Sequence, residues 1–396
     1  MERYVSSGEG SFVLGMWPLW MGRTVRRTMQ IDGLELENFR NYDRAEAEFD
    51  SRCNVICGEN AQGKTNLLES LRYLSCGRSQ RTRTDRDMIT FQRDQASVAA
   101  RVFARDREFL VRAELFRDRR RKFSINRVAA KNAAALSEVF QTVFFCPEDL
   151  LLIREGAAVR RRFLDGALCQ LRPRYAAALA DYNRAYEHKT RILRDAEERP
   201  DLLELLPEFN RQLVQRGAVL IHYRAQFTEK LAVCAAENHF LCSGEKERLE
   251  ISYQTVSAVS DPLAPLPEVA LRLEEHMERH QRAELASRLC LSGPHKDDLS
   301  VCIDGRDAKQ FSSQGQTRTA ALAIKLAERE IFKNVMGEFP ILLLDDVLSE
   351  LDPKRQEFVL NRIDGGQVFI TCCEEDRLPQ LLGGRVFHVK QGRIET

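Results

Sequence analysis

The sequence predicts an α/β protein with a mixed sheet core, an antiparallel β layer and an inserted α-helical second domain. Three observations support this fold class. An apolar run at 54–57 leads into a glycine-containing loop and then into a helical pattern that starts at Lys64. Apolar and charged residues alternate within 97–126, as in strands of an antiparallel layer. Apolar residues recur at helical spacing over 155–245.

Residues 29–150 are predicted to form the N-terminal part of the α/β unit. Leu34 and Leu36 alternate with Glu35 and Glu37, which indicates a strand with one buried face. A second alternating strand follows at 45–50. The apolar residues at 54–57 and 141–145 are typical of short buried strands.

Residues 151–285 are predicted to form the helical insert, a long hairpin interrupted near Pro200 and Pro207. Its apolar stripes are interpreted as packing within the domain and not as a groove for a partner. Strand patterns return at 299–303, 341–344 and 367–371, within a C-terminal α/β part at 286–396. Because the two α/β parts flank the insert, we expect them to form one discontinuous domain.

The first 28 residues differ from the rest. The apolar stretch at 12–22 is short, lacks a basic segment before it and is followed by arginines, which is the wrong order for a signal peptide. A clean alternating strand begins at Met29. We therefore expect residues 1–28 to be an N-terminal extension that is disordered or was assigned upstream of the natural start at Met29.

Composition excludes several classes. Sixty basic and 59 acidic residues give a net charge of +1, so a surface that binds nucleic acid must be a local patch. The longest uncharged run, 10–22, contains Pro18 and is too short to cross a membrane. The eleven cysteines form no Cys-x-x-Cys pair, which argues against a zinc site and favours reduced thiols in a cytoplasmic protein.

A phosphate-binding loop is the clearest motif, because 58–65 fits G-x(4)-G-K-[ST] without a mismatch, between a strand and a helix. Lys64 is expected to reach the β- and γ-phosphates of ATP, and the Thr65 hydroxyl to bind Mg²⁺. The backbone of the loop is expected to surround the phosphates. The predicted nucleotide-binding residues here are Gly58, Glu59, Asn60, Ala61, Gln62, Gly63, Lys64, Thr65 and Asn66.

Two carboxylates follow the apolar run at 341–344, which is the Walker B pattern. Asp345 is predicted to hold Mg²⁺ through water. Asp346 is predicted to polarise the attacking water as the general base, and it joins Lys64 as a predicted catalytic residue.

The segment 312–316 lies before a predicted helix and about 30 residues before Asp345. On its own it could be an ordinary helix cap. Its place between the phosphate-binding loop and Walker B instead favours an ABC-type signature, with 349–352 as the D-loop. The signature adds four predicted nucleotide-binding residues: Ser313, Gln314, Gly315 and Gln316.

These motifs, in this order, resemble those of an ABC-type P-loop ATPase head. The particular residues within them resemble the RecF family of bacterial recombination mediators. The blocks that support the resemblance are 36–42, 58–69, 147–150, 160–165, 293–299, 313–316 and 343–352. The resemblance implies a nucleoid-associated, ATP-dependent homodimer in which Ser313, Gly315 and Gln316 contact the partner's γ-phosphate. It also implies work with RecO and RecR to load RecA at single-strand gaps and at double-strand/single-strand junctions.

Two departures from ABC heads predict slow hydrolysis. Many such heads carry a glutamate where this chain has Asp346, and a histidine after the last core strand. Here that strand ends in Thr371-Cys-Cys-Glu374. We therefore expect a weak DNA-dependent ATPase that acts as a switch.

A basic segment at 101–131 contains eleven basic and four acidic residues, and a second basic group occupies 78–86. Basic charge concentrated in one segment suits contacts with the phosphates of single- and double-stranded DNA, without sequence specificity. A solvated polar face is the alternative. The predicted DNA-binding residues are Arg112, Arg119, Arg120, Arg121 and Lys122.

Three rival classes fit less well. The ATPase subunit of a membrane transporter would lack an insert of this kind. An SMC-type ATPase would need hundreds of heptad residues between its halves, which 151–285 cannot supply. A structural component that does not hydrolyse ATP would not need Lys64, Asp345 and Asp346, and only a rate measurement separates that class.

Overall fold

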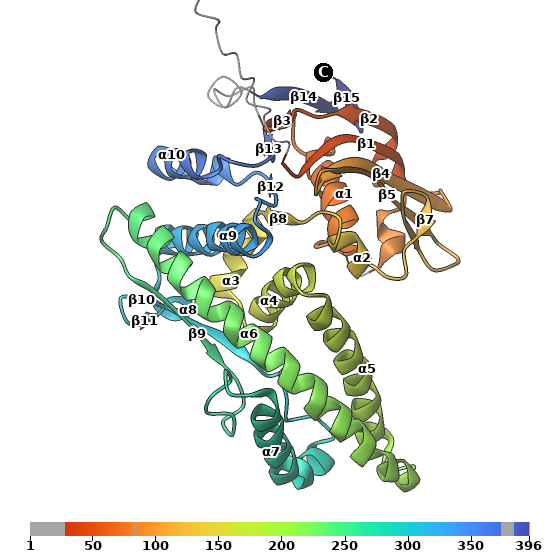
Figure 1. The fold of residues 1–396 in the computed structure, drawn as a ribbon, viewed down its shortest axis with the longest axis vertical. Coiled ribbons are helices and arrows are strands. Elements are labelled where there is room, and N and C mark those ends of the chain that lie inside the picture. The colour runs from red at the N-terminus through yellow and green to blue at the C-terminus, as the bar shows by residue number, and fades with distance from the viewer. Residues whose placement is uncertain (1–27, 83, 374–383, 396) are drawn as a thin grey trace, which may run out of the picture.

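The computed structural model describes residues 28–82, 84–373 and 384–395, which form three sheets and a set of long helices. The expectation for residues 1–28 falls almost entirely outside the described residues. Figure 1 shows the α/β layers at the top and the longest helices below them.

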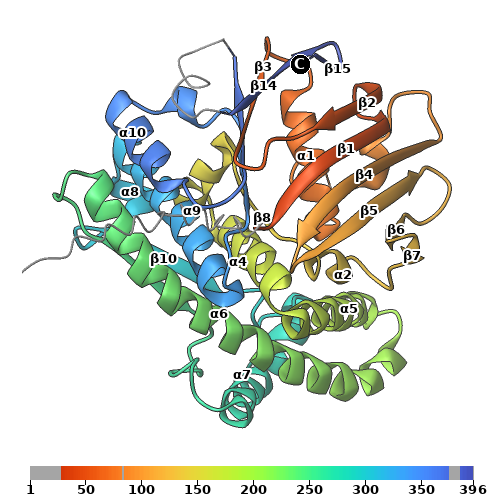
Figure 2. The same ribbon diagram turned by 45° about the horizontal axis from the view of Figure 1, so that its top comes forward.

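The first sheet is the expected antiparallel layer, with the strand order β2-β1-β4-β5-β6-β7. Figure 2 shows β2, β1, β4 and β5 side by side. Leu34 and Leu36 are buried and Glu35 and Glu37 are exposed, as their alternation predicts. The strands are β1 (Gln30–Phe39), β2 (Tyr42–Glu48), β4 (Gln95–Ala104), β5 (Arg107–Phe116), β6 (Lys122–Ile125) and β7 (Val128–Ala129).

The second sheet brings together strands from both ends of the chain, in the order β15-β14-β3-β13-β12-β8. Neighbouring strands in this sheet are parallel, except that β14 and β15 pair with each other in antiparallel fashion. The inner strands β3, β13 and β12 and the edge strand β8 are buried at every position, because both faces of the sheet are covered there. The strands are β3 (Cys53–Cys57), β8 (Thr142–Phe145), β12 (Ile341–Leu344), β13 (Val368–Cys372), β14 (Arg385–Lys390) and β15 (Arg393–Glu395).

Two hydrophobic cores meet at this second sheet. Ile341 and Leu343 of β12 pack in the core that contains the first sheet and α1 (Lys64–Cys76). Leu342 and Leu344 of the same strand pack in the core that contains the long helices. Successive residues of a strand point to opposite faces, so one strand contributes to both cores.

Most of the long helices lie within the range 151–285 predicted for the insert. After the short α3 (Leu151–Arg154), they are α4 (Ala157–Leu171), α5 (Pro173–Asp195), α6 (Leu206–Cys242) and α7 (Leu266–Ser287). Helix α9 (Gln314–Met336), from the C-terminal part, packs against α6. Helices α5 and α6 run side by side as the expected hairpin (Figure 1). Pro207 stands in the first turn of α6, where a missing backbone N–H costs nothing.

A third, three-stranded sheet departs from expectation. Its antiparallel order β11-β10-β9 joins β9 (Leu249–Gln254), from within the predicted helical insert, to β10 (Asp298–Ile303) and β11 (Arg306–Asp307). The strand expected at 299–303 therefore pairs beside the helices and not in the α/β core. Its alternating burial explains this, because β10 has only one covered face.

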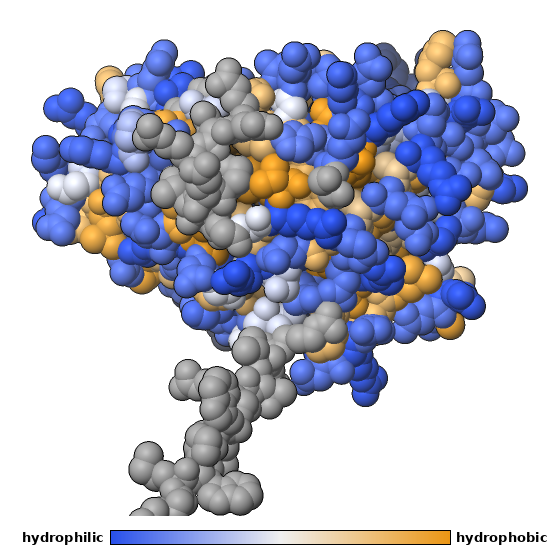
Figure 3. Space-filling model, turned by 90° about the horizontal axis from the view of Figure 1, so that it is seen from above, coloured by the Kyte–Doolittle hydropathy of each residue, from blue (hydrophilic) through white to orange (hydrophobic). Residues whose placement is uncertain are grey.

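The remaining elements are short: α2 (Ala134–Ser137), α8 (Ala308–Phe311), α10 (Pro353–Arg362), η1 (Asp85–Met88), η2 (Pro147–Leu150), η3 (Pro200–Leu205) and η4 (Leu348–Glu350). Among the described residues, no helix combines the length and apolar character needed to cross a bilayer. The face seen from above is mostly hydrophilic, with hydrophobic residues showing in its middle (Figure 3).

Candidate nucleotide site and basic surface

The phosphate-binding loop connects β3 to α1, as its sequence predicts. Gly58 and Gly63 have φ values of 152° and 124°, which residues with side chains rarely adopt. A Cβ atom on Gly58 would lie 2.4 Å from the Val389 carbonyl oxygen, and one on Gly63 would lie 2.7 Å from Asn41 Nδ2. Both glycines are therefore required by conformation and by space.

Two turns from other parts of the chain hold the loop in place. Tyr42 donates from its hydroxyl to the Gly63 carbonyl at 3.0 Å, and Asn41 Nδ2 donates to the Gln62 carbonyl at 2.7 Å. The Gly392 amide donates to the same Gln62 carbonyl at 3.1 Å. The phosphate-binding motif at 58–65 does not predict these hydrogen bonds. Asn41 and Tyr42 do fall in a block whose sequence resembles the RecF family.

Lys64 begins α1, and its ammonium group lies at the loop. Nζ donates to the carbonyl of Gly58 at 2.6 Å and to that of Glu59 at 2.9 Å. The side chain is buried, with 7% exposed. A cation beside a helix N-terminus makes this a position where negative charge is favoured.

The structure brings Thr65 and Asp345 together from 280 residues apart. Thr65 Oγ1 donates to Asp345 Oδ1 at 3.0 Å, and Thr371 Oγ1 donates to the same oxygen at 2.9 Å. Burial raises the pKa of the Asp345 carboxyl above its ordinary value, against the two hydroxyl hydrogen bonds that lower it. A hydroxyl and a carboxylate oxygen at this spacing fit the hard oxygen ligands that Mg²⁺ prefers.

Asp346 is held in a left-handed conformation, with φ 51°. Its amide donates to Thr371 Oγ1 at 2.8 Å, and its Oδ1 accepts from the Ser349 hydroxyl at 2.7 Å. Thr371 therefore bonds the Asp345 carboxylate and the Asp346 backbone amide of the Walker B segment. Sequence reasoning missed Thr371, because β13 reads only as an apolar strand.

Ser313 caps the N-terminus of α9. Its Oγ accepts from the Gln316 amide at 3.2 Å, while Gln316 Oε1 accepts from the Ser313 amide at 2.9 Å, which is a capping box. Gln316 Nε2 also donates to Glu247 Oε1 at 2.9 Å. The helix-cap alternative is thus present in the geometry. It leaves Ser313 and Gln314 exposed.

The D-loop lies against the same helix. Asp352 caps α10 by accepting from the amides of Lys354 and Arg355 at 3.1 and 3.2 Å. Arg355 Nε donates to Thr319 Oγ1 in α9 at 2.8 Å. A Cβ atom on Gly315 would lie 3.5 Å from Arg355 Nη2. The signature and D-loop segments therefore form one contiguous surface.

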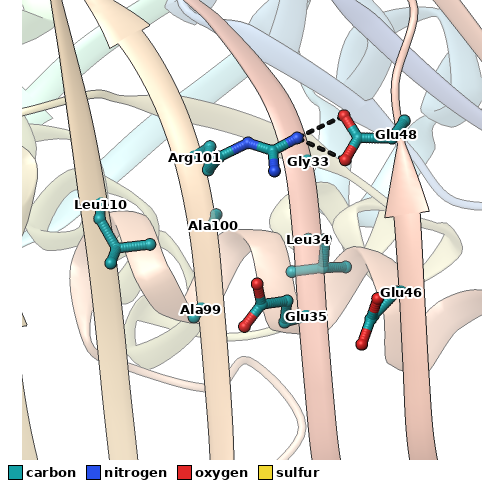
Figure 4. Close-up of a pocket in the computed structure, with 9 residues that line it drawn as sticks. All are labelled: Gly33, Leu34, Glu35, Glu46, Glu48, Ala99, Ala100, Arg101 and Leu110. Atoms are coloured by element: carbon teal, nitrogen blue, oxygen red, sulfur yellow. Dashed lines mark hydrogen bonds and ion pairs between the residues drawn. The ribbon is translucent and has the colours of Figure 1, made fainter.

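Two of the predicted DNA-binding arginines have acidic partners within the chain. Arg112 lies 3.5 Å from Glu35, across the outer face of the first sheet. Figure 4 shows a shallow hollow on this face, where Arg101 pairs with Glu48 beside Glu35 and Glu46. Arg121 lies 2.8 Å from Asp85. These pairs reduce the charge that Arg112 and Arg121 offer to a nucleic acid.

Arg119, Arg120 and Lys122 are exposed, in and beside the loop between β5 and β6. The Arg119 guanidinium stacks over the Phe116 ring at 3.9 Å. The Arg121–Asp85 pair joins this loop to 78–86, so the two basic groups of the sequence lie together. The exposed members of that second group are Arg78, Arg81 and Arg86, whereas residue 83 lies outside the described part of the chain.

Comparison with known proteins identifies the family. The family model of the RecF/RecN/SMC N terminal domain matches residues 30–393. The DNA replication and repair protein RecF of Agathobacter rectalis is 36% identical over 372 residues, which cover 93% of this chain and 99% of that protein. The chain belongs to the RecF family. The Bacillus subtilis RecF is likewise 36% identical, over 92% of this chain and 100% of that protein.

Solved RecF structures share the fold. The structure described as the recombination mediator protein RecF-ATPrS in RecFOR pathway has a TM-score of 0.86 and 32% identity, over 93% of this chain and 98% of that one. The corresponding RecF-ATP structure has a TM-score of 0.83 and 33% identity, over 93% and 99%. An Smc head domain from Pyrococcus furiosus has a TM-score of 0.54 at 15% identity, which shows a shared head fold alone. RecF membership places the chain among the DNA replication and repair proteins.

Proposed function

We propose that this chain is an ATP-dependent DNA-binding switch that acts as a recombination mediator. It binds ATP with Mg²⁺, closes into a homodimer on DNA and hydrolyses ATP slowly. One observation supports this above all: Lys64, Thr65 and Asp345 converge where β3 and β12 end. The names of the RecF relatives, and the solved RecF-ATP and RecF-ATPrS structures, also favour ATP binding and a role in recombination.

Each residue of the site has a distinct task. The loop amides and Lys64 hold the β- and γ-phosphates, and Lys64 exchanges its carbonyl partners for phosphate oxygens. Thr65 and Asp345 are the groups that would hold Mg²⁺, which neutralises phosphate charge when bound. Asp346 accepts a proton from the attacking water; Ser349 orients its carboxylate, and Thr371 holds its backbone amide.

A second subunit supplies what one chain lacks. The Ser313 hydroxyl and the Gln316 side chain each accept from the other residue's backbone amide, and Gln316 also donates to Glu247, so these bonds do not go to the phosphate-binding loop. The exposed helix N-terminus at Ser313 suits a phosphate that arrives from outside. We infer that Ser313, Gly315 and Gln316 contact the γ-phosphate bound to the partner subunit, with Asp352 at the dimer contact.

Hydrolysis is expected to be slow. The base is an aspartate, whose side chain is one methylene shorter than the glutamate of many ABC heads. The strand that would precede a histidine ends in Thr371 and Cys372, and Cys373 follows it. Slow turnover suits a timer that stays closed on DNA for a defined period.

DNA contacts are assigned to the exposed arginines and Lys122 of the two joined loops. They suit phosphates of single- or double-stranded DNA, so binding should depend on salt and on DNA structure more than on sequence. The RecFOR pathway named for a solved relative favours RecO and RecR as partners. We propose that the outcome is the loading of RecA at gaps and junctions. A cytoplasmic, nucleoid-associated location follows from this role.

The decisive experiment measures the mass of the protein in solution with and without ATP and Mg²⁺, in the presence of short duplex DNA. A dimer that forms only with ATP supports the switch. A particle whose mass is independent of nucleotide would contradict it.

A further inference from the structure

Two cysteines meet directly behind the phosphate-binding loop. Cys57 is the last residue of β3 and precedes Gly58, and Cys372 is the last residue of β13. The two residues are opposite one another in the parallel pairing of these strands. Their Sγ atoms lie 3.1 Å apart, a thiol–thiol contact, in a buried position.

Residues next to this pair contact the phosphate-binding loop and the Walker B segment. Gly58, next to Cys57, accepts a hydrogen bond from Lys64 Nζ. Cys373, next to Cys372, has its Sγ 3.9 Å from Lys64 Nζ and donates to Asn60 Oδ1 at 3.1 Å. On the other side of Cys372, Thr371 bonds the Asp345 carboxylate and the Asp346 backbone amide. A change at the sulfur pair therefore reaches the lysine and the metal-binding oxygens through adjacent residues.

We propose that Cys57 and Cys372 form a thiol-oxidation site, which reacts with a small hydroperoxide and becomes a disulfide. One sulfur attacks the peroxide, and the O–O bond breaks to leave a sulfenic acid and an alcohol, or water when the reagent is hydrogen peroxide. The second sulfur then displaces the sulfenic oxygen as water and the S–S bond forms. The two thiols lose two electrons and two protons, which reduce the peroxide.

The geometry suits this bond. A disulfide has a sulfur–sulfur length of about 2.05 Å, and the Cα atoms that it joins are usually about 4.4–6.8 Å apart. Neighbouring strands lie about 4.8 Å apart, so directly paired residues meet this requirement without separating the strands. A shift of about 1 Å in the sulfur atoms is enough.

Oxidation is expected to weaken ATP binding, a consequence that rests on the proposed nucleotide site. The bond fixes the ends of β3 and β13 to each other and limits the adjustment of Gly58, Lys64 and Thr371 around the phosphates. ATP and Mg²⁺ should in turn slow oxidation, because the effects of two ligands on each other are reciprocal.

The test treats the full reduced chain with hydrogen peroxide, with and without ATP and Mg²⁺, then alkylates the remaining thiols and digests the protein. We expect one cross-linked peptide pair containing Cys57 and Cys372. ATP affinity should fall by about fivefold or more, which is within the usual range of coupling between sites, and should return with dithiothreitol.

Two variants separate this site from other thiols. Cys57→Ser should form no cross-link and should keep its ATP affinity in peroxide. Cys53→Ser is the matched control, because Cys53 is also buried on the same strand but is paired with Val368 of β13 and not with a cysteine. This control should respond to peroxide as the unaltered chain does.

Absence of the Cys57–Cys372 peptide pair would overturn the proposal, as would unchanged ATP affinity in protein shown to contain it. An equal loss of affinity in oxidised Cys57→Ser would also overturn it and would assign the effect to Cys373. Failure of the reduced, unaltered chain to bind ATP would instead refute the nucleotide site, while the peptide result would still decide the thiol chemistry.

Discussion

Substitution of Ser313 can separate its role as a helix cap from its proposed role at the partner's phosphate. Ser313 Oγ accepts from the Gln316 amide at 3.2 Å and so begins α9. Asp and Asn cap helices about as well as Ser, whereas Ala costs about 1 kcal/mol. Ser313→Asp and Ser313→Asn should therefore both preserve the helix. Only the first adds a negative charge.

The magnitude follows from Coulomb's law. A carboxylate and one phosphate charge about 4 Å apart repel by about 4 kcal/mol at an effective dielectric constant of 20. Because Ser313 is exposed and water screens part of this repulsion, we take about 1.4 kcal/mol, which is a tenfold factor. A closed dimer contains two such sites, so the ATP-dependent dimer of Ser313→Asp should be about 100-fold weaker.

The assay measures dimer dissociation constants by sedimentation with ATP and Mg²⁺, and nucleotide affinity on dilute monomer. Ser313→Asp should bind ATP normally and dimerise poorly, while Ser313→Asn should remain within a few-fold of the unaltered chain. Equal dimer affinities for the two variants would refute the trans contact and leave 313–316 as a helix cap. A matching loss of thermal stability in both would assign the effect to folding.

Four further results are expected. Lys64→Met removes the cation held at the loop and should abolish ATP binding together with ATP-dependent DNA binding; unchanged nucleotide affinity by calorimetry would contradict the site. Asp346→Asn should bind ATP and prolong the dimer on DNA, since it removes the base and keeps the shape, and hydrolysis at the normal rate would exclude Asp346 as the base. Reversal of Arg119 and Arg120 to Glu should lower DNA affinity and reduce the salt slope by about 0.9 for each lost phosphate contact. Because Arg112 is already paired with Glu35, Arg112→Gln should change DNA affinity little in the same titration. A loss of affinity as large as that from reversal of Arg119 and Arg120 would show that the sheet face binds DNA.

Local sequence determined the parts of the fold that depend on period and spacing. Alternation at Leu34 and Leu36 predicted β1, because every second residue of a strand faces the same side. The loop at 58–65 was equally clear, since Gly58 and Gly63 must adopt backbone angles that few other residues tolerate. The order of the motifs along the chain predicted a head domain with a helical insert.

Tertiary structure decided which distant residues complete the site. Thr371, which bonds the Asp345 carboxylate and the Asp346 backbone amide, lies in a strand that the sequence marks only as apolar. The sequence placed Arg112 in a basic segment, and the neighbouring strands brought Glu35 against it. Likewise, β9 forms a strand within a region predicted to be helical, because it pairs antiparallel with β10. Periodicity reports how a segment presents its own faces, whereas the partner of each face depends on how segments far apart in the chain pack together.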